Sequence, residues 1–315
     1  MVLTQVMSHP HTNAVAIMGA TAIGKSDLAI RLAERIDGEI ISMDSRQVYR
    51  GLDIGTGKVP HEDLQRVPHH LIDILDPSEL NTAGTHLARA LEAQEAIRAR
   101  GRIPVFAGGT GLYFRVLFRG LIDVGVPDDE LRDLRDTFAT RSTTELYQEL
   151  LRLDPERAAS LSKNDRQRIV RSLEIYHHTG KSHTRYLAEG TGSASWQGLK
   201  IVLTMPRPML RSRVAERTRQ MFDDGWVDEV KVLLARGITL DAPAMNSLGY
   251  DVIARAILKG EDPMSTVDSI ITRTQQYAKR QETFFRSEVD ALWFDVSDPV
   301  AQHRIEQRVR EHLGL

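Results

Sequence analysis

The stretch from Gly19 to Ser26 matches the phosphate-loop pattern G-x-x-x-x-G-K-[ST] at every defined position. Its glycines let the backbone curl so that successive N–H groups face an anion, and a helix beginning here adds the positive end of its dipole. Lys25 would bridge phosphoryl oxygens, and the Ser26 hydroxyl would be a ligand of Mg²⁺. The stretch predicts a site for a phosphorylated compound and Mg²⁺, formed by Gly19, Ala20, Thr21, Ala22, Ile23, Gly24, Lys25 and Ser26.

A carboxylate follows the next apolar run. Asp44 comes directly after residues 39–43, which we expect to form a strand adjacent to the phosphate loop. Ligands of open α/β sheets bind at the carboxyl ends of strands. A carboxylate there can ligate Mg²⁺ through water, as in an NTPase, or accept a proton from a nucleophile, although a simple turn or helix cap is the alternative. Residues 44–58 are mostly polar and contain several glycines, which is typical of a functional loop.

Apolar runs alternate with helical periodicity through much of the chain. We expect strands at residues 13–18, 39–43, 71–75, 103–107, 199–204 and 291–295. We expect helices at 26–36 and 85–100, and a long helical stretch that begins after Pro206 and Pro208 and continues past Arg219. This alternation predicts an α/β fold with a parallel sheet covered on both faces. Together with the phosphate loop it indicates a core like that of P-loop NTPases.

Between residues 112 and 186 the pattern is helical only, with segments near 129–139, 143–152 and 164–178. A glycine- and serine-rich stretch at 189–195 closes this region. We therefore expect a flexible tail at 1–12 and a P-loop core with C-terminal helices made of 13–118 and 196–315. Residues 119–195 would form an inserted all-helical domain.

The composition excludes several protein classes. With 315 residues, 41% hydrophobic and 27% charged, the chain resembles ordinary globular proteins and excludes general disorder. The lack of cysteine excludes disulfides, thiolate zinc sites and a cysteine nucleophile. Because no apolar run reaches bilayer length and the start lacks a signal-peptide pattern, we expect a cytoplasmic protein that does not contact a membrane.

Two basic clusters stand out in a chain of net charge −2. Residues 163–186 carry a net +4, from Lys163, Arg166, Arg168, Arg171, Lys181 and Arg185 against Asp165 and Glu174. Arg168 and Arg171 share a helical face and could bind phosphates together. The alternative is that this face of the helix is only exposed to solvent. The second cluster interleaves basic and aromatic side chains, which suits RNA, although core packing would also explain its phenylalanines: Arg273, Tyr277, Lys279, Arg280, Phe284, Phe285 and Arg286.

Four motifs, at residues 19–26, 44–58, 108–113 and 277–281, resemble in type and order the signatures of tRNA dimethylallyltransferases, the tRNA isopentenyltransferase family. The resemblance covers residues from about 14 to about 286. It implies transfer of a dimethylallyl group from dimethylallyl diphosphate to N6 of adenine 37, in tRNAs that read codons starting with U. It further implies Mg²⁺ as cofactor, the tRNA anticodon stem-loop as partner, tRNA binding by the helical insertion at residues 119–195, and a monomer.

The resemblance also implies roles for individual residues. Asp44 would engage the adenine amine, Thr21 and Lys25 would hold the donor diphosphate, and Arg217 would bind it from the opposite side; these four are the expected catalytic residues. From the resemblance and the basic clusters, we expect tRNA contacts at Asp44, Ser45, Arg46, Gln47, Thr110, Arg132, Gln167, Arg168, Ile169, Val170, Arg171, Lys279 and Arg280. Gln275 and Phe284 depart from the family pattern, which has arginine and tryptophan there, and this bears on how tRNA is held.

Three alternatives remain open from the sequence. The phosphate loop alone favours a nucleotide-dependent kinase or ATPase, which would turn over ATP without any prenyl donor. An adenylate dimethylallyltransferase would use a free nucleotide as acceptor, but the basic helical insertion argues against a small acceptor. A non-catalytic RNA-binding module would explain the basic clusters but not Lys25, Ser26 or Asp44.

Overall fold

The computed structural model describes residues 13–120, 128–189, 196–287 and 290–315. The chain divides into two compact units, a core unit of Met1–Phe118 with Trp196–Leu315 and a helical unit of Arg119–Ser195. Within the described ranges, no helix combines the length and the apolar character needed to cross a membrane.

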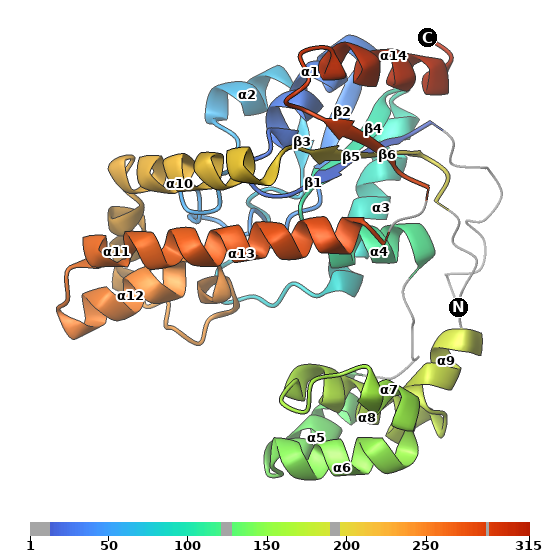
Figure 1. The fold of residues 1–315 in the computed structure, drawn as a ribbon, viewed down its shortest axis with the longest axis vertical. Helices are drawn as coiled ribbons and strands as arrows, with labels where there is room; N and C mark the ends of the chain where they lie inside the picture. The colour runs from blue at the N-terminus through green and yellow to red at the C-terminus, as the bar shows by residue number, and fades with distance from the viewer. Residues whose placement is uncertain (1–12, 121–127, 190–195, 288–289) are drawn as a thin grey trace. The chain divides into compact units, whose positions relative to one another are not determined.

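The core unit is built on a six-stranded parallel sheet (Figure 1). The strands are β1 (Val15–Gly19), β2 (Gly38–Ser42), β3 (His69–His70), β4 (Ile103–Gly108), β5 (Leu199–Thr204) and β6 (Leu292–Asp295), in the order β3-β2-β4-β1-β5-β6. The α/β fold with a P-loop type of sheet is thus confirmed. One expectation is wrong: β4 lies between β2 and β1, so the strand before Asp44 is not the neighbour of the phosphate-loop strand.

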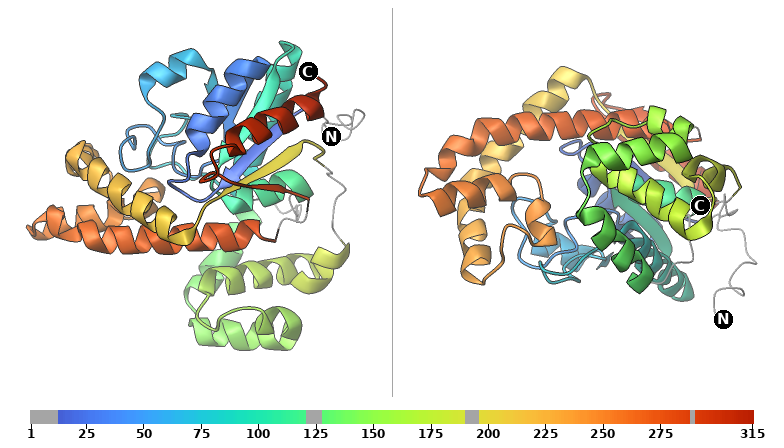
Figure 2. Two further views of the ribbon diagram at one scale, coloured as in Figure 1. Left: turned by 45° about the horizontal axis from the view of Figure 1, so that its top comes forward. Right: turned by 90° about the horizontal axis from the view of Figure 1, so that it is seen from below.

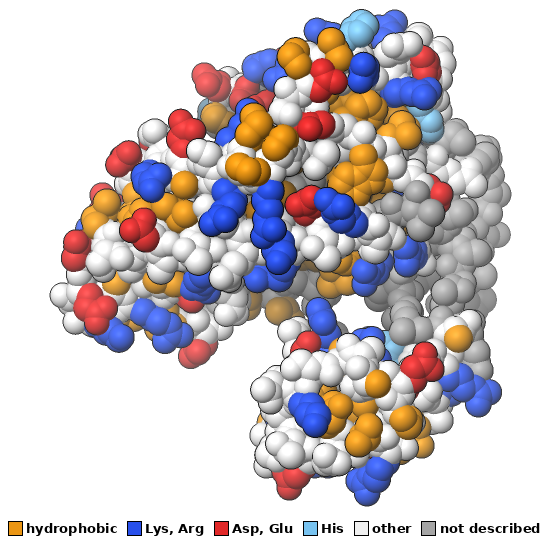
Figure 3. Space-filling model, viewed as in Figure 1, with side chains coloured by type: hydrophobic (Ala, Val, Ile, Leu, Met, Phe, Trp, Pro, Cys, Tyr) orange, Lys and Arg blue, Asp and Glu red, His pale blue; other side chains and the backbone are white. Residues whose placement is uncertain are grey.

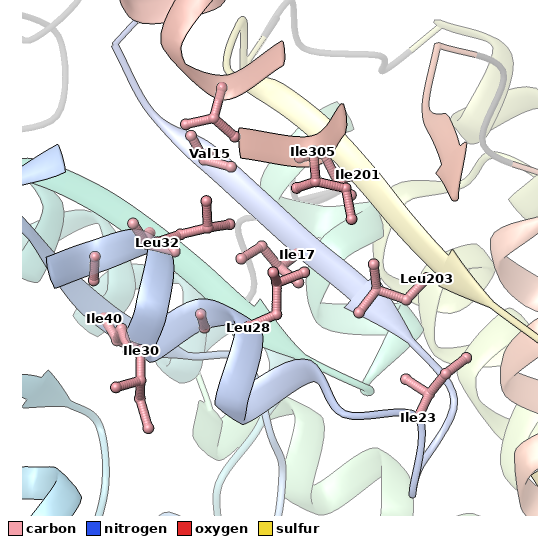
Figure 4. Close-up of a cluster of buried hydrophobic side chains, with 14 of the residues drawn as sticks. Val15, Ile17, Ile23, Leu28, Ile30, Leu32, Ile40, Ile201, Leu203 and Ile305 are labelled. Carbon is pink, nitrogen blue, oxygen red and sulfur yellow. The ribbon is translucent and has the colours of Figure 1, made fainter. Parts of the chain in front are cut away.

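Helices cover both faces of this sheet, as the two views of Figure 2 show. Those that matter for the site are α1 (Lys25–Ile36), α3 (Ala83–Ala99), α4 (Gly111–Arg119), α10 (Arg207–Asp223), α13 (Val267–Phe285) and α14 (Ala301–Leu313). On one face Val15 and Ile17 pack with Leu28, Leu32 and Ile305 of α1 and α14 (Figure 4). The alternate residues of β1, Ala16 and Met18, pack on the other face with aromatic side chains of α4 and α13. This alternation buries β1 on both sides and explains its unbroken apolar run.

A third cluster stabilises the loop that follows β2. Its helices are α11 (Trp226–Ala235) and α12 (Tyr250–Lys259), and the short helices η1 (Pro243–Asn246) and η2 (Pro263–Thr266) flank α12 in the chain. The short helix α2 (His61–Arg66) follows the loop itself. Val48, Tyr49 and Leu52 are buried against Trp226 and Tyr250. The polar loop after Asp44 is therefore anchored by apolar side chains instead of projecting into solvent.

The expected strand at residues 71–75 is wrong, because the chain leaves the sheet edge after His70. Leu71 and Asp73 adopt left-handed backbone conformations, with φ of 66° and 55°. The N–H groups of Asp73 and Leu75 donate to the carbonyls of Gln47 and Val48, not to a sheet strand. The apolar residues of this segment are thus buried by a loop-to-loop contact.

The helical unit contains α5 (Asp128–Ala139), α6 (Thr143–Leu153), α7 (Pro155–Ala159), α8 (Arg166–Thr179) and α9 (His183–Glu189). The three expected helices in this region are confirmed. Ser142 and Glu145 form a reciprocal capping box at the start of α6, and Asp165 caps α8. The unit has its own apolar core, which includes Phe138, Leu146, Leu150, Ile169 and Leu173.

Candidate active site

The phosphate loop connects β1 to α1, where the motif predicts it. Gly24 stands at the N-cap of α1 in a left-handed conformation with φ of 95°, which favours glycine. Among the described residues no side chain caps this helix, which leaves its first N–H groups free for an anion. Gly19 is required for a different reason: a Cβ there would lie 2.9 Å from the carbonyl oxygen of Leu203.

A cavity of about 580 Å³ opens beside this loop. It is lined by Thr21, Ala22, Lys25 and Ser26 of the loop, by Asp44, Ser45, Arg46 and Gln47 after β2, and by Arg217 of α10. Gly108, the last residue of β4, and Gly109 also line it, and α13 contributes Arg273, Tyr277, Arg280 and Gln281. The fold thus brings the four expected catalytic residues to one cavity within the core unit, although nearly 200 positions separate the first from the last.

Asp44 lines this cavity and also organises its own loop. Its Oδ1 accepts hydrogen bonds from the N–H groups of Arg46, at 2.8 Å, and of Gln47, at 3.4 Å. The next residue is tied to the loop after β4, because the Ser45 N–H donates to Thr110 Oγ1 at 3.1 Å. The turn-cap role and a role in the cavity are therefore both open to this carboxylate.

Two cations face Asp44 across the cavity. Burial lowers the pKa of Lys25 to about 8, an effect that Asp44 opposes and Arg217 reinforces. Lys25 Nζ donates to the Ala20 carbonyl at 2.7 Å. Burial also lowers the pKa of Arg217, whose Nη2 donates to the carbonyl of Gly57 at 3.3 Å. Two cations that line one cavity are suited to a multiply charged anion.

Helix α13 contributes a residue whose role the sequence did not reveal. Gln281 Oε1 accepts a hydrogen bond from the Thr21 N–H at 2.9 Å, and its Nε2 donates to the Gly109 carbonyl at 2.8 Å. Gln281 thereby ties α13 to the phosphate loop. Tyr277 lies one turn earlier on the same face, and burial together with Asp44 raises its pKa to about 12. The spacing of these two residues by four was the available signal.

Known proteins share this sequence and fold. A sequence model described as IPP transferase matches residues 47–288, and one described as isopentenyl transferase matches residues 12–74. The chain belongs to the IPP transferase family. It is 43% identical over 305 residues to a tRNA dimethylallyltransferase of Methylococcus capsulatus, covering 95% of this chain and 97% of the relative.

Solved structures of family members agree with this assignment. The tRNA isopentenylpyrophosphate transferase of Bacillus halodurans superposes with a TM-score of 0.71 at 34% identity, covering 96% of this chain and 97% of that one. A eukaryotic dimethylallyltransferase described as acting on tRNA superposes with a TM-score of 0.81 at 27% identity, covering 94% of this chain and 77% of that one.

Other expected tRNA contacts in the core unit lie along α13. Arg280 lines the cavity and stacks on Tyr277, whereas Lys279 lines an outer groove between α10 and α13. In that groove Gln275 accepts a hydrogen bond from Arg211 Nε and donates one to the Arg211 carbonyl. Phe284 carries the Arg115 guanidinium over its ring. Figure 3 shows Lys and Arg side chains gathered over this face of α10 and α13, as an RNA-binding surface requires.

In the helical unit the expected contacts differ in exposure. Gln167 and Arg168 are exposed, and the Arg168 side chain retains 69% of its accessible surface. Arg171 pairs with the buried Glu174 at 3.1 Å. Ile169 is fully buried in the core of the unit, so its side chain cannot contact RNA, and Val170 packs against the same core. The side chain of Arg132 lies outside the described residues.

Arg166, which contributes to the net positive charge of this segment, has an internal role. Its guanidinium donates to the carbonyls of Phe138 and Arg141, at 2.6 and 2.8 Å. These bonds join the start of α8 to the end of α5. Counting charge along the sequence therefore overstates how much of it faces solvent.

Proposed function

We propose that this chain transfers the dimethylallyl group of dimethylallyl diphosphate to N6 of adenine 37, in tRNAs that read codons starting with U. Dimethylallyl transfer to tRNA is the activity named for its relatives at about 40% identity over most of the chain. One observation of the structure carries the finer assignment: Asp44, Lys25 and Arg217 line the same cavity. A carboxylate and a diphosphate-binding cation pair are what this reaction needs together.

The acceptor side of the reaction is assigned to Asp44. The exocyclic amine of adenine is a poor nucleophile because its lone pair is delocalised into the ring. In the proposed step a bond forms between adenine N6 and C1 of the dimethylallyl group, while the bond from C1 to the diphosphate oxygen breaks. The N6 proton passes to the Asp44 carboxylate. Adenine must first leave its stack in the anticodon loop, at a cost of a few kcal/mol that protein contacts offset.

The donor side is assigned to the phosphate loop and Arg217. Negative charge accumulates on the departing diphosphate, and Lys25, Arg217 and the loop N–H groups stabilise it. The loop also fits Mg²⁺, because the exposed Ser26 hydroxyl is a hard oxygen ligand facing the same cavity. Within the described ranges no cluster of three or more His, Asp or Glu side chains could hold a metal ion. When bound, Mg²⁺ supplies charge neutralisation on the diphosphate.

The decisive experiment supplies labelled dimethylallyl diphosphate, Mg²⁺ and an unmodified anticodon stem-loop. Label should enter the RNA at adenine 37 and should be lost when that adenine is replaced by guanine. In a parallel reaction with a free adenine nucleotide in place of the RNA, label in that nucleotide would indicate an adenylate dimethylallyltransferase. ATP hydrolysis without a prenyl donor would indicate a kinase or ATPase, and RNA binding without any transfer would indicate a binding module.

Diphosphate binding should depend on pH through Lys25. In the free protein this ammonium loses its proton as pH rises through about 8. A bound anion favours the charged form of Lys25. The affinity for inorganic diphosphate should therefore be highest below that pH and should fall above it, by up to about tenfold per pH unit. Calorimetry from about pH 7 to about pH 10 at constant Mg²⁺ measures this. Lys25→Arg stays charged over this range, so an unchanged inflection in that variant would assign the effect to another group.

Arg168 and Arg171 should contact RNA phosphates. Replacing both with alanine is expected to weaken stem-loop binding and to flatten its salt dependence, because each single-strand phosphate contact contributes about −0.7 to the slope of log K against log salt. Arg168 should account for more of the effect, because its side chain is 69% exposed and lies 3.4 Å from Asp165, whereas Arg171 is 40% exposed and pairs with the buried Glu174 at 3.1 Å. Binding is measured over a salt series, with the exposed Arg152→Ala of α6 as control. An unchanged slope would mean that this face of α8 is merely solvated.

A further inference from the structure

The loop at residues 53–57 is held by a single carboxylate. Glu229, in the first turn of α11, accepts hydrogen bonds from three successive backbone N–H groups, those of Asp53 and Ile54 at 2.7 Å and of Gly55 at 3.3 Å. The hydroxyl of the buried Tyr250 donates to the same carboxylate at 2.5 Å. Three consecutive N–H groups form a concave anion site, so the negative charge of Glu229 fixes the shape of this loop.

The loop held in this way is a wall of the proposed active site. Gly55, Thr56 and Gly57 line the cavity. A Cβ at Gly55 would lie 2.0 Å from Nε1 of Trp226, and one at Gly57 would lie 1.9 Å from Nη2 of Arg217. Gly57 also has a φ of 60°, which favours glycine. The backbone is therefore pressed directly against Arg217.

The Gly57 carbonyl is the point of contact with Arg217. It accepts hydrogen bonds from Arg217 Nη2 at 3.3 Å and from Gln47 Nε2 at 3.2 Å. Across the parts of the chain that the structure describes, no carboxylate forms an ion pair with Arg217. The guanidinium is thus oriented by a neutral carbonyl, and its charge stays available to an anion in the cavity.

A second charged side chain closes the loop on its other side. Lys58 Nζ donates to the Tyr49 carbonyl and to Asp53 Oδ1, both at 2.6 Å, and also to Asp73. Its side chain is almost fully buried in these contacts. The Glu229 carboxylate therefore binds the loop through its backbone N–H groups, and the Lys58 ammonium binds it through the Asp53 side chain, so both ends of the 53–57 segment are fixed.

We propose that Glu229 is a positioning residue for the transfer reaction. By holding the 53–57 backbone it places the Gly57 carbonyl, and through that carbonyl it orients the Arg217 guanidinium toward the leaving diphosphate. Glu229 does not itself line the cavity. This inference rests on the proposed function, because it assigns Arg217 to the diphosphate.

The test is a double-mutant cycle between Glu229→Gln and Arg217→Lys, read out as dimethylallyl transfer to the stem-loop. Glu229→Gln removes the charge with little change in shape and should lower kcat by about tenfold while the KM for RNA stays within about twofold. A lysine at 217 lacks Nη2 and loses the link to Gly57. Adding Glu229→Gln to the Arg217→Lys variant should therefore lower kcat by less than about twofold.

The matched control is Asp228→Asn, which removes the neighbouring carboxylate of the same helical turn. Asp228 is 77% exposed and pairs only with Lys231 among the described residues, so kcat should be unchanged. If Glu229→Gln does not fold, Glu229→Asp enters the same cycle, because its shorter side chain cannot reach all three N–H groups. An equal loss in the wild-type and Arg217→Lys backgrounds would overturn the proposal. Failure of the unaltered protein to transfer the group would instead refute the proposed function.

Discussion

Replacing Asp44 with alanine is expected to lower turnover of the RNA substrate by roughly 10²–10⁴-fold, the usual contribution of a general base. The adenine amine would then lose the group that takes its proton as the new C–N bond forms. RNA affinity should change much less, because the neighbouring contacts remain. Single-turnover transfer at saturating stem-loop RNA and donor measures the chemical step, and equilibrium titration measures RNA binding.

The variant Asp44→Asn distinguishes a role of Asp44 as general base from a role as the cap of its own turn. An asparagine side chain can still accept the hydrogen bonds that Arg46 and Gln47 donate to Asp44 Oδ1. It cannot serve as a base near neutral pH, so its turnover should fall as far as that of Asp44→Ala. Near-normal turnover of Asp44→Asn would mean that Asp44 only shapes the loop.

Replacing Lys25 with alanine should have the second largest effect, a loss of roughly 10²–10³-fold in kcat/KM for dimethylallyl diphosphate. The variant removes a half-buried ammonium from the phosphate loop, where partial exclusion of solvent strengthens its attraction for an anion. Steady-state kinetics with the donor varied at saturating RNA give this value. Binding of the RNA alone should be unaffected.

Thr21→Ala gives a smaller change in the same loop. It removes the hydroxyl but keeps the backbone N–H that donates to Gln281. Donor use should be impaired while the link to α13 survives. If Lys25→Ala and Thr21→Ala both behave like the unaltered protein, the donor does not bind in this loop.

Local features were readable without a structure because their physical causes are local. The phosphate loop needs its glycines, lysine and serine at set spacings along a single turn, so eight residues suffice to predict it. Helical periodicity likewise predicts α6 and α8, since each helix buries one face. The family resemblance, carried by four short motifs, is confirmed by the comparisons over most of the chain.

Contacts between residues distant in the chain could be identified only from the tertiary structure. Apolar patterning indicates that Leu71 and Leu75 are buried, but the hydrogen bonds to Gln47 and Val48 decide that residues 71–75 form no strand. Strand order also follows from long-range packing, which places β4 between β1 and β2. The contacts of Gln281 with the phosphate loop and of Glu229 with the 53–57 backbone join segments more than 170 residues apart. A hydrogen bond needs a partner within about 3 Å, and only the folded chain establishes which polar groups meet at that distance.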